Sequence, residues 1–255
     1  ILKGCELIPL SDLAASLREK GIYDITFTPA KSLVRYYRYA HEDGELIILC
    51  SEDVYSESRF TITLPEDREY RIYDPWRNML FKPRRNGRDI EMYLPKSGMV
   101  FVVTSDADCG DYDYHLTEGR IADYDLSVSI RSAEKSSSTD SGFLPTDFSV
   151  GDDITADMAS FAGTIRYEGT IDLSSDDKVL CLGEVGEIAE VTLGGVNLGR
   201  AVCCPYEIDI EGKCVDGDNH IIIDVVNNLG YRERDIFSSY LTFPPSGLTG
   251  EIRVR

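Results

Sequence analysis

The C-terminal half of the chain alternates between apolar and polar residues over several short segments. In the first of these segments the apolar side chains recur at every second or fourth position, at Ile165, Tyr167, Ile171 and Leu173. This period of two predicts a strand with one buried face, because successive side chains of a strand point to opposite sides. Residues 189–193 repeat the pattern and end at Gly194-Gly195, which predicts a tight hairpin turn since glycine tolerates positive φ. Recurring strands and turns predict an antiparallel sandwich.

The N-terminal half shows strand signals from residue 33 onward. Apolar segments predict strands at residues 34–39, 46–50, 60–64, 70–72, 90–94 and 99–103. Residues 46–50 (LIILC) are apolar without interruption, which is typical of a strand buried on both faces. Residues 73–76 (YDPW) predict a turn. These segments together predict a compact all-β unit.

One helix is predicted, near the N-terminus. Leu13, Ala14 and Leu17 form an apolar stripe, Ser11 is placed to cap the helix, and Gly21 is placed to end it. Because the stripe is short, the helix needs packing from another part of the protein.

The predicted fold class is therefore all-β, with two β-sandwich domains and one short N-terminal helix. We expect residues 1–30 to form a segment with the helix, residues 31–116 a small β-sandwich, and residues 117–255 the second sandwich. The acidic, turn-rich stretch 105–118 reads as a solvated linker. Its aspartates lack the spacing of an EF-hand calcium loop.

Six motifs of the second half resemble, in order, the sugar-binding domain of glycoside hydrolase family 2 and its relatives. They are FxGxIxY from Phe161, LxLGxV from Leu180, AxVxLxGxxLG from Ala189, PYxxDI from Pro205, GDNHIIIDVVN from Gly217 and SGLTGEI from Ser246. The resemblance implies a galactose-binding-like jelly roll. The family usually carries Asn-Gly at the hairpin tip, and here Gly194 holds the Asn position, so any role of that amide is lost.

Three shorter motifs of the first half resemble the small sandwich that follows the catalytic barrel in rhamnosidase-type relatives of family 2. They are RYxxY from Arg35, YDPWxN from Tyr73 and LPxxGxVFV from Leu94. The resemblance implies that an upstream catalytic domain of the same polypeptide is the partner of this region. The chain begins at Ile1 without an initiator Met, which agrees with a piece of a longer protein.

Composition narrows the classes of partner. A formal net charge of −19 disfavours nucleic acid and anionic membrane surfaces. No apolar run approaches the ~20 residues that a membrane helix needs. Seven cysteines, an odd number without a CxxC motif, argue against a disulfide framework or a zinc site. With no signal peptide visible, a reducing, cytoplasmic location is expected.

The sequence assigns no catalytic residue. The family's catalytic unit is a (β/α)8 barrel of ~250 residues, and the alternating strands and helices that it needs are missing from this pattern. The three histidines, His41, His115 and His220, share no ligand spacing. No metal ligand and no cofactor are expected, although a structural calcium ion in the jelly roll is left open.

Sugar binding is a further possibility, because saccharides are held by aromatic faces and planar polar groups. The candidate binding residues lie in loops of the second sandwich: Tyr231, Arg232, Arg234, Tyr206 and Asn197. Each also has a structural explanation, since Tyr206 can fill the edge of the core and the arginines can pair with nearby acids.

Three functions remain open. The first is a non-catalytic accessory region of a large glycoside hydrolase, which supports an upstream barrel and can contact oligo- or polysaccharide. The second is a free-standing carbohydrate-binding protein. The third is a self-contained glycosidase that uses two carboxylates ~5–9.5 Å apart.

Overall fold

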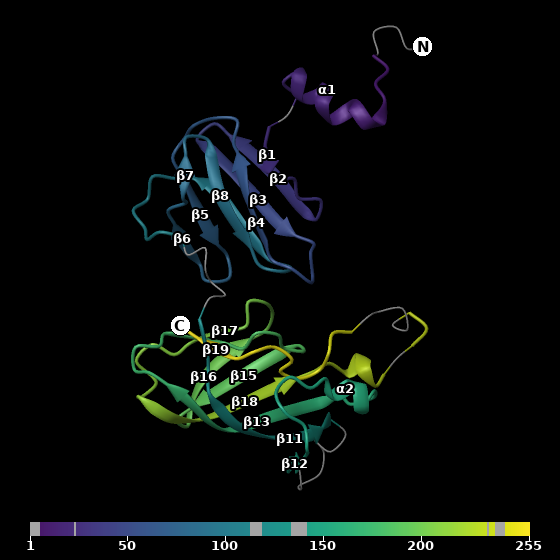
Figure 1. Cartoon of the computed structure of the whole chain (residues 1–255), viewed down its shortest axis with the longest axis vertical. Helices are drawn as coiled ribbons and strands as arrows, with labels where there is room; N and C mark the ends of the chain where they lie inside the picture. Colours follow the sequence, from purple (N-terminus) through teal and green to yellow (C-terminus); the bar gives the residue numbers. More distant parts are fainter. Residues whose placement is uncertain (1–5, 23, 113–118, 134–141, 234, 238–242) are drawn as a thin grey trace. The chain divides into compact units, whose positions relative to one another are not determined.

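The computed structural model describes residues 6–22, 24–112, 119–133, 142–233, 235–237 and 243–255. The chain divides into two compact units, residues 1–114 and 115–255 (Figure 1). The domain boundary predicted between residues 116 and 117 lies outside the described residues. Each unit contains two sheets, and every named strand pair is antiparallel. The predicted all-β class with two sandwiches and an N-terminal helix is confirmed.

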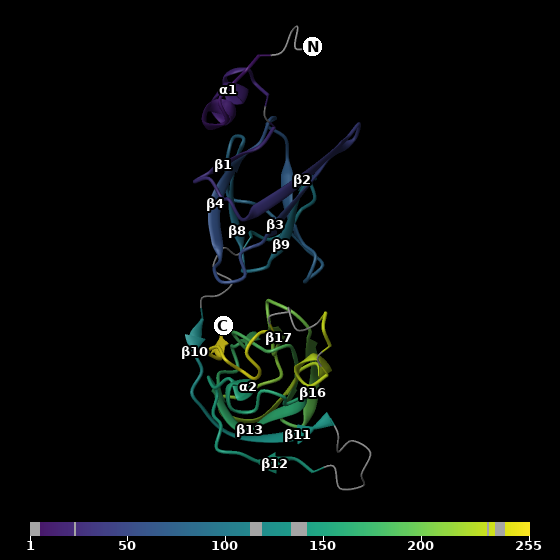
Figure 2. The same ribbon diagram turned by 90° about the vertical axis from the view of Figure 1, so that its right-hand side faces the viewer.

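The first unit is a sandwich of a five-stranded and a four-stranded sheet (Figure 2). The five-stranded sheet has the order β2-β3-β9-β5-β6, and the four-stranded sheet the order β1-β4-β8-β7. The strands are β1 (Thr26–Thr28), β2 (Val34–His41), β3 (Gly44–Ser51), β4 (Ser58–Thr63), β5 (Tyr70–Asp74), β6 (Met79–Phe81), β7 (Arg85–Asn86), β8 (Asp89–Leu94) and β9 (Met99–Thr104). Fully buried side chains from both sheets, such as Ile47, Leu49, Ile62 and Ile90, form the core.

The helix forms where it was predicted. A 3₁₀ turn, η1 (Leu10–Asp12), leads into α1 (Leu13–Glu19), and Gly21 follows with a φ of 67°. The capping prediction was wrong, since the N-cap is Asp12 and it forms no side-chain cap bond, while Ser11 donates a hydrogen bond to the Asp12 carboxylate. No residue of α1 is buried.

The second unit pairs a six-stranded with a four-stranded sheet. The six-stranded sheet has the order β12-β11-β13-β18-β15-β16, and the four-stranded sheet the order β10-β19-β14-β17. The elements are β10 (Arg120–Ile121), β11 (Tyr124–Ser132), β12 (Leu144–Pro145), α2 (Ile154–Asp157), β13 (Gly163–Leu173), β14 (Val179–Cys181), β15 (Ile188–Leu193), β16 (Val196–Ala201), β17 (Glu207–Asp209), β18 (Gly217–Val226), η3 (Leu229–Tyr231) and β19 (Arg253–Val254). The one-turn helix α2 was not predicted, because its four residues lack a periodic stripe.

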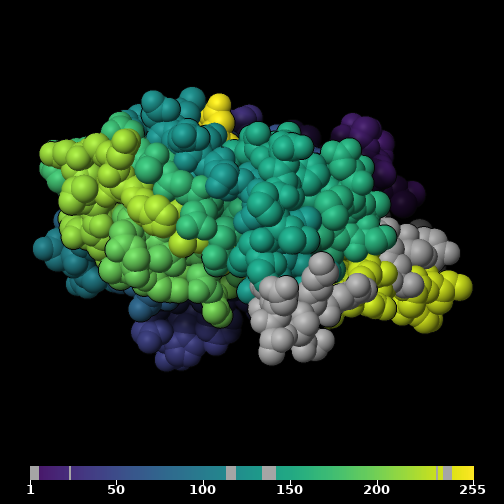
Figure 3. Space-filling model, turned by 90° about the horizontal axis from the view of Figure 1, so that it is seen from below, coloured from purple at the N-terminus to yellow at the C-terminus, as the bar shows by residue number. Residues whose placement is uncertain are grey.

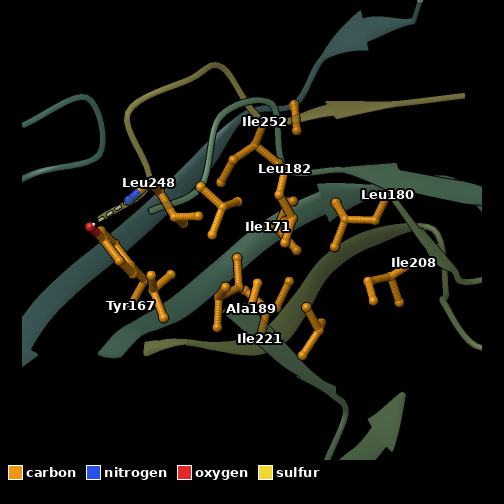
Figure 4. Packing of buried hydrophobic residues seen from close by; sticks show 14 of the residues in the cluster. Tyr167, Ile171, Leu180, Leu182, Ala189, Ile208, Ile221, Leu248 and Ile252 are labelled. Atoms are coloured by element: carbon orange, nitrogen blue, oxygen red, sulfur yellow. Dashed lines mark hydrogen bonds between the residues drawn. The ribbon is translucent and has the colours of Figure 1, made fainter. Parts of the chain in front are cut away.

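The period of two seen in the sequence corresponds to the core of this unit. The alternating residues of β13 and β18 point inward, and Tyr167 is fully buried (Figure 4). The Tyr167 hydroxyl accepts a hydrogen bond of 2.9 Å from the backbone N–H of Leu248, so the closing segment of the chain is tied to the middle of the sheet. Gly194 and Gly195 form the predicted turn between β15 and β16, with φ of 56° and 82°.

One prediction about the first unit was wrong, and a second was incomplete. β3 is not buried on both faces: Ile47 and Leu49 are buried, whereas Leu46, Ile48 and Cys50 are half-buried on the other face. Residues 105–112 are not simply a solvated linker, because the N–H of Lys82 donates to Gly110 O (2.7 Å) and the buried Tyr112 packs edge-on against Phe81. In the part of the chain that the structure describes, no helix is long and apolar enough to cross a membrane.

Candidate functional site

The loops at one end of the six-stranded sheet carry most of the polar side chains considered as candidates. At this end β11 and β18 finish while β13 and β15 begin, as the pairs Ser132–Gly163 and Ile188–Val226 show. We call it the loop end, and it comprises the described residues 131–133, 142–163, 186–188 and 226–233. Figure 3 looks onto the side of the unit that carries β11 and β12, drawn in teal.

Asn227 holds the loop end together. Its side chain is buried, and Oδ1 accepts a hydrogen bond from the Gly163 N–H at 2.8 Å. Nδ2 donates to Phe161 O at 2.9 Å and to Ser246 Oγ at 2.8 Å. A buried amide with all of these partners satisfied gives the surrounding loops a rigid frame.

A cavity of about 610 Å³ opens beside this frame. Its walls combine apolar side chains with two guanidinium groups, from Ile130, Leu144, Met158, Phe161, Arg131 and Arg232. A second hollow of about 410 Å³ shares Arg131 and Ser132 and extends to Asn227 and Leu229. Apolar walls with a few planar donors are typical of small-ligand sites, and guanidinium groups suit hydroxyl or carboxylate oxygens.

Phe143 orders the arginines on the outer surface next to the cavity. The guanidinium carbon of Arg166 lies 4.1 Å, and that of Arg131 4.7 Å, from the centroid of the Phe143 ring. Arg166 also makes two 2.7 Å hydrogen bonds with the carboxylate of Asp224 on the neighbouring strand. Cation–π contact and a two-pronged ion pair restrict these side chains more than a surface ion pair alone would.

The sequence-predicted residues are placed unequally with respect to this cavity. Arg232 lines it. Tyr231 is 4% exposed, its hydroxyl donates to Pro244 O, and its ring lies 4.8 Å from that of Phe243, so it anchors a loop instead of presenting a ring face. Arg234 lies outside the described residues.

Tyr206 and Asn197 lie on other elements. Tyr206 is half-buried against the core; burial, with the nearby Cys203, Cys204 and Glu187, raises its pKa to about 12. Asn197 is exposed on β16, where its amide donates to Glu190 (2.6 Å) and its carbonyl accepts from the Gly199 N–H (2.8 Å).

Asn197 lies several residues away from the loop end, measured along the strands of the sheet. Its partner in the register, Thr192, lies opposite Ile222, whereas the loop end starts at Val226. With about 3.3 Å per residue, this separates Asn197 from the loop end by roughly 13 Å. The structure therefore brings Tyr231 and Arg232 together and leaves Asn197 apart.

Sequence reasoning missed Arg131, Glu187 and Asn228. The Asn228 amide donates to the Glu187 carboxylate, and its own oxygen accepts from the Gly230 N–H (2.6 Å) to cap η3. Burial raises the pKa of Glu187 even though the amide of Asn228 opposes the shift. Nothing in the sequence around these residues distinguishes them from other polar residues in loops, because the groups that surround them come from distant strands.

A further hollow of about 600 Å³ is lined by Asp147, Asp152, Asp153 and Asp157. Burial would raise the pKa of Asp153, but hydrogen bonds from Thr155 and from the Ser246 N–H outweigh it and the pKa is lowered. Asp153 is the N-cap of α2, which is a structural task. Among the described residues, no group of three or more His, Cys, Asp or Glu side chains is placed to hold a metal ion.

No family model matches the sequence, and the search of curated proteins finds no match. Among solved structures, a rhamnosidase from Novosphingobium sp. PP1Y matches with a TM-score of 0.61 and 20% identity over 97% of this chain. The match covers 26% of the rhamnosidase, so this chain spans about a quarter of that protein.

Two further structures match with lower scores. A β-glucuronidase from an uncultured Clostridium sp. has a TM-score of 0.29 at 22% identity, covering 43% of this chain and 23% of that protein. An anti-sigma factor domain-containing protein has a TM-score of 0.30 at 12% identity, covering 78% and 83%. These two scores carry no argument about the fold, whereas the first match shows that the chain shares the fold of one region of the rhamnosidase.

Proposed function

We propose that this chain is a non-catalytic accessory region of a large glycoside hydrolase, in which it supports a catalytic domain on the same polypeptide. The observation that carries the proposal is the unequal coverage of the rhamnosidase match, with 97% of this chain aligned to 26% of that protein. In such a protein the remaining three quarters contain room for the catalytic machinery. The motifs of both halves resemble the accessory sandwiches of the same enzyme group, which supports the proposal independently.

The second unit is proposed to be a galactose-binding-like jelly roll. The residues of its motifs are those that hold the sandwich together, including Tyr167, Asn227 and Ser246. The cavity of the loop end favours a second candidate function, binding of a saccharide, because Arg131 and Arg232 face an apolar pocket of suitable volume.

A self-contained glycosidase receives less support. A general acid of such an enzyme needs a raised pKa and a second carboxylate nearby. Glu187 meets the first condition, but its carboxylate accepts a hydrogen bond from the Asn228 amide and not from a second carboxyl group. The acid-lined hollow contains Asp153, whose pKa is shifted in the opposite direction.

Turnover of aryl glycosides, including an aryl rhamnoside, tests the proposal. We expect no turnover by the purified 255-residue chain and turnover by the product of the complete reading frame. Turnover by the 255-residue chain that Glu187→Gln abolishes, and that the half-exposed Glu168→Gln control leaves unchanged, would establish the self-contained enzyme and overturn the proposal.

Saccharide binding is tested separately by calorimetric titration of the 255-residue chain with rhamnose-containing oligosaccharides. Binding that Arg232→Gln weakens, and that the exposed Arg200→Gln control does not, would support the second function. No heat of binding at millimolar sugar would remove it without affecting the accessory role.

A further inference from the structure

The outer face of the five-stranded sheet in the first unit consists of apolar and aromatic side chains apart from two arginines. Since alternate residues of its strands point into the core, the remaining residues point outward. The register places one outward row across all five strands, consisting of Tyr37, Ile48, Phe101, Tyr73 and Leu80. The adjacent rows contain Tyr39, Leu46, Val103 and Arg71 on one side, and Arg35, Cys50 and Met99 on the other. We call these side chains the outer face.

Within the first unit the outer face is only partly covered, and Arg71 is the one member that is buried. Tyr37 is 62% and Tyr39 52% exposed. On the inner strands β3 and β9 the outward apolar side chains are half-buried, whereas the inward apolar side chains that alternate with them are buried. Phe101 and Tyr73 contact each other, with ring centroids 5.7 Å apart. Figure 2 shows β2, β3 and β9 in one layer of the sandwich, with β4 and β8 in the other. A contiguous apolar surface of this kind marks an interaction site in a protein.

The second unit provides an internal comparison. Three adjacent outward rows of its six-stranded sheet include four carboxylates, at Asp125, Glu168, Glu190 and Asp224. The outer face of the first unit has none in its three rows, although the chain contains 45 acidic residues. One sheet therefore has the polar face that an antiparallel sheet presents to water, and the other does not.

The sequence of β3 agrees with this contrast. Residues 46–50 have the uninterrupted apolar pattern of a strand that is buried on both faces, yet the structure buries one. The failed prediction is explained if another protein surface covers Leu46, Ile48 and Cys50.

The outer face is close to electrically neutral. Arg35 pairs with Glu52 (2.7 Å), and the Nε of Arg71 donates to Ala107 O (2.7 Å). Its cations are thus already engaged within the unit, so the face offers no charge to an anionic partner. Its central row combines aliphatic side chains with aromatic rings, and its three rows contain no Asn, Gln, Asp or Glu side chain to bracket the hydroxyls of a saccharide. Its chemistry fits an apolar, neutral protein surface.

The size of the outer face favours a tethered partner over a second copy. Five strands spaced about 4.8 Å apart and about six residues long span on the order of 450 Å². That is about half of the ~800 Å² per partner of a stable complex between separate proteins. It is adequate between domains of one polypeptide, where interfaces of 600–1,500 Å² in total are usual. Two copies that each carry a charge of −19 would also repel one another.

We infer that the outer face is the docking surface for the catalytic domain of the same polypeptide. This inference rests on the proposed function and names the contact through which the support is given. The helix α1 has the same need for a partner, since seven residues without a buried side chain do not make a stable helix in water.

Hydroxyl-radical footprinting tests the inference on two proteins, the 255-residue chain and the product of the complete reading frame. We expect Tyr37, Tyr39 and Met99 to be oxidised readily in the 255-residue chain and several-fold more slowly in the complete product. The exposed Tyr55 and Phe237 serve as references and should react equally in both.

A matched pair of variants locates the contact. Ile48→Glu in the complete product should restore the oxidation of Tyr37 and Tyr39, whereas Ile222→Glu should not. Both residues are half-buried isoleucines on inner strands, and Ile222 lies on the polar face of the other sheet. The footprint of the unsubstituted protein decides the question even if Ile48→Glu fails to fold.

Four results would overturn the inference. Equal oxidation in both proteins would show that the face stays uncovered in the complete product. Protection in the 255-residue chain that depends on protein concentration would show that a second copy covers the face. Protection that does not depend on concentration would show that the second unit covers it. Protection of the 255-residue chain by added oligosaccharide would make the face a glycan surface. Glycosidase activity of the complete product is measured separately. The docking inference can therefore fail while the proposed function stands, and the proposed function can fail while the face is still protected.

Discussion

At the scale of single residues, the motifs that resemble a sugar-binding domain are explained by the fold. Asn219 and Asn227 stand at the two ends of the GDNHIIIDVVN motif. The Asn219 side chain accepts from the Val215 N–H (3.0 Å) and donates to Val215 O and Gly217 O (both 2.7 Å), which closes the turn before β18. Asn227 closes the loop end after β18. The motif therefore specifies how one central strand is entered and left.

We expect Asn227→Ala to destabilise the second unit by about 2–4 kcal/mol, because buried backbone groups at Gly163 and Phe161 lose their partners. The free energy of unfolding in urea measures the effect. Asn197→Ala, at an exposed amide of the same unit, is the control and should change stability by less than about 0.5 kcal/mol. Equal losses in the two variants would contradict a bracing role of Asn227.

Tyr167 predicts a pH dependence. Burial raises its pKa to about 12, although the hydrogen bond from Leu248 acts in the opposite direction. A tyrosine whose folded-state pKa is raised stabilises the fold below its unfolded pKa of about 10, and this stability is lost as the pH rises through the folded value. Between pH 10 and 12 the free energy of unfolding of the parent chain should therefore fall more steeply than that of Tyr167→Phe. The difference in slope should be up to about 1.4 kcal/mol per pH unit.

At pH 7 the same Tyr167→Phe variant should be about 1–2 kcal/mol less stable, because the Leu248 N–H loses a buried acceptor. Urea unfolding at a series of pH values follows both effects, and the two stability curves should converge above pH 10. Curves that stay parallel would show that the Tyr167 hydroxyl does not titrate with a raised pKa.

At the scale of elements, local patterns were reliable where one strand face is buried inside its own unit. The strands around Tyr167 and Ile47 and the turn at Gly194-Gly195 were predicted because period two and glycine punctuation are local signals. The second face of β3 was predicted wrongly, since an apolar run does not specify which surface covers it. Helix α2 is too short to show a period.

The β15–β16 hairpin tests the turn chemistry. Both tip glycines have positive φ and no atom within 4 Å of an added Cβ, so backbone conformation and not space limits substitution. Gly194→Asn should keep the stability within about 0.5 kcal/mol, since Asn tolerates the left-handed region and Asn-Gly is favoured in this turn.

Gly194→Val should lose about 1–2 kcal/mol, because a β-branched residue is strained at positive φ. Thermal unfolding of the two variants beside the parent chain compares them directly. If Gly194→Asn is as destabilising as Gly194→Val, the left-handed conformation at the tip is wrong.

At the scale of the whole molecule, the sequence predicted two sandwiches and one residue of the candidate site, Arg232, but not the cavity that it lines. Arg131 and Arg232 come from distant parts of the chain and meet because β11, β13 and β18 are neighbours in one sheet. Strand order of this kind depends on long-range pairing, and alternation within a strand carries no information about it. The candidates chosen from loops were therefore partly structural, as Tyr231 is, and partly at a distance, as Asn197 is.

Two separate cores predict that the units unfold separately. Ile62 in the first unit and Ile223 in the second are both fully buried isoleucines of inner strands, so replacing either with Ala should cost about 2–5 kcal/mol in its own unit. Trp76, the single tryptophan, belongs to the first unit. Its fluorescence therefore reports that unit, while far-UV circular dichroism reports both.

In urea, Ile62→Ala should move the fluorescence transition to lower denaturant, and Ile223→Ala should leave it in place while shifting part of the dichroism signal. The two variants act as controls for each other because residue type, burial and strand position are matched. Were Ile223→Ala to shift the Trp76 fluorescence as far as Ile62→Ala does, the two cores would unfold as one cooperative body, which would contradict their independence.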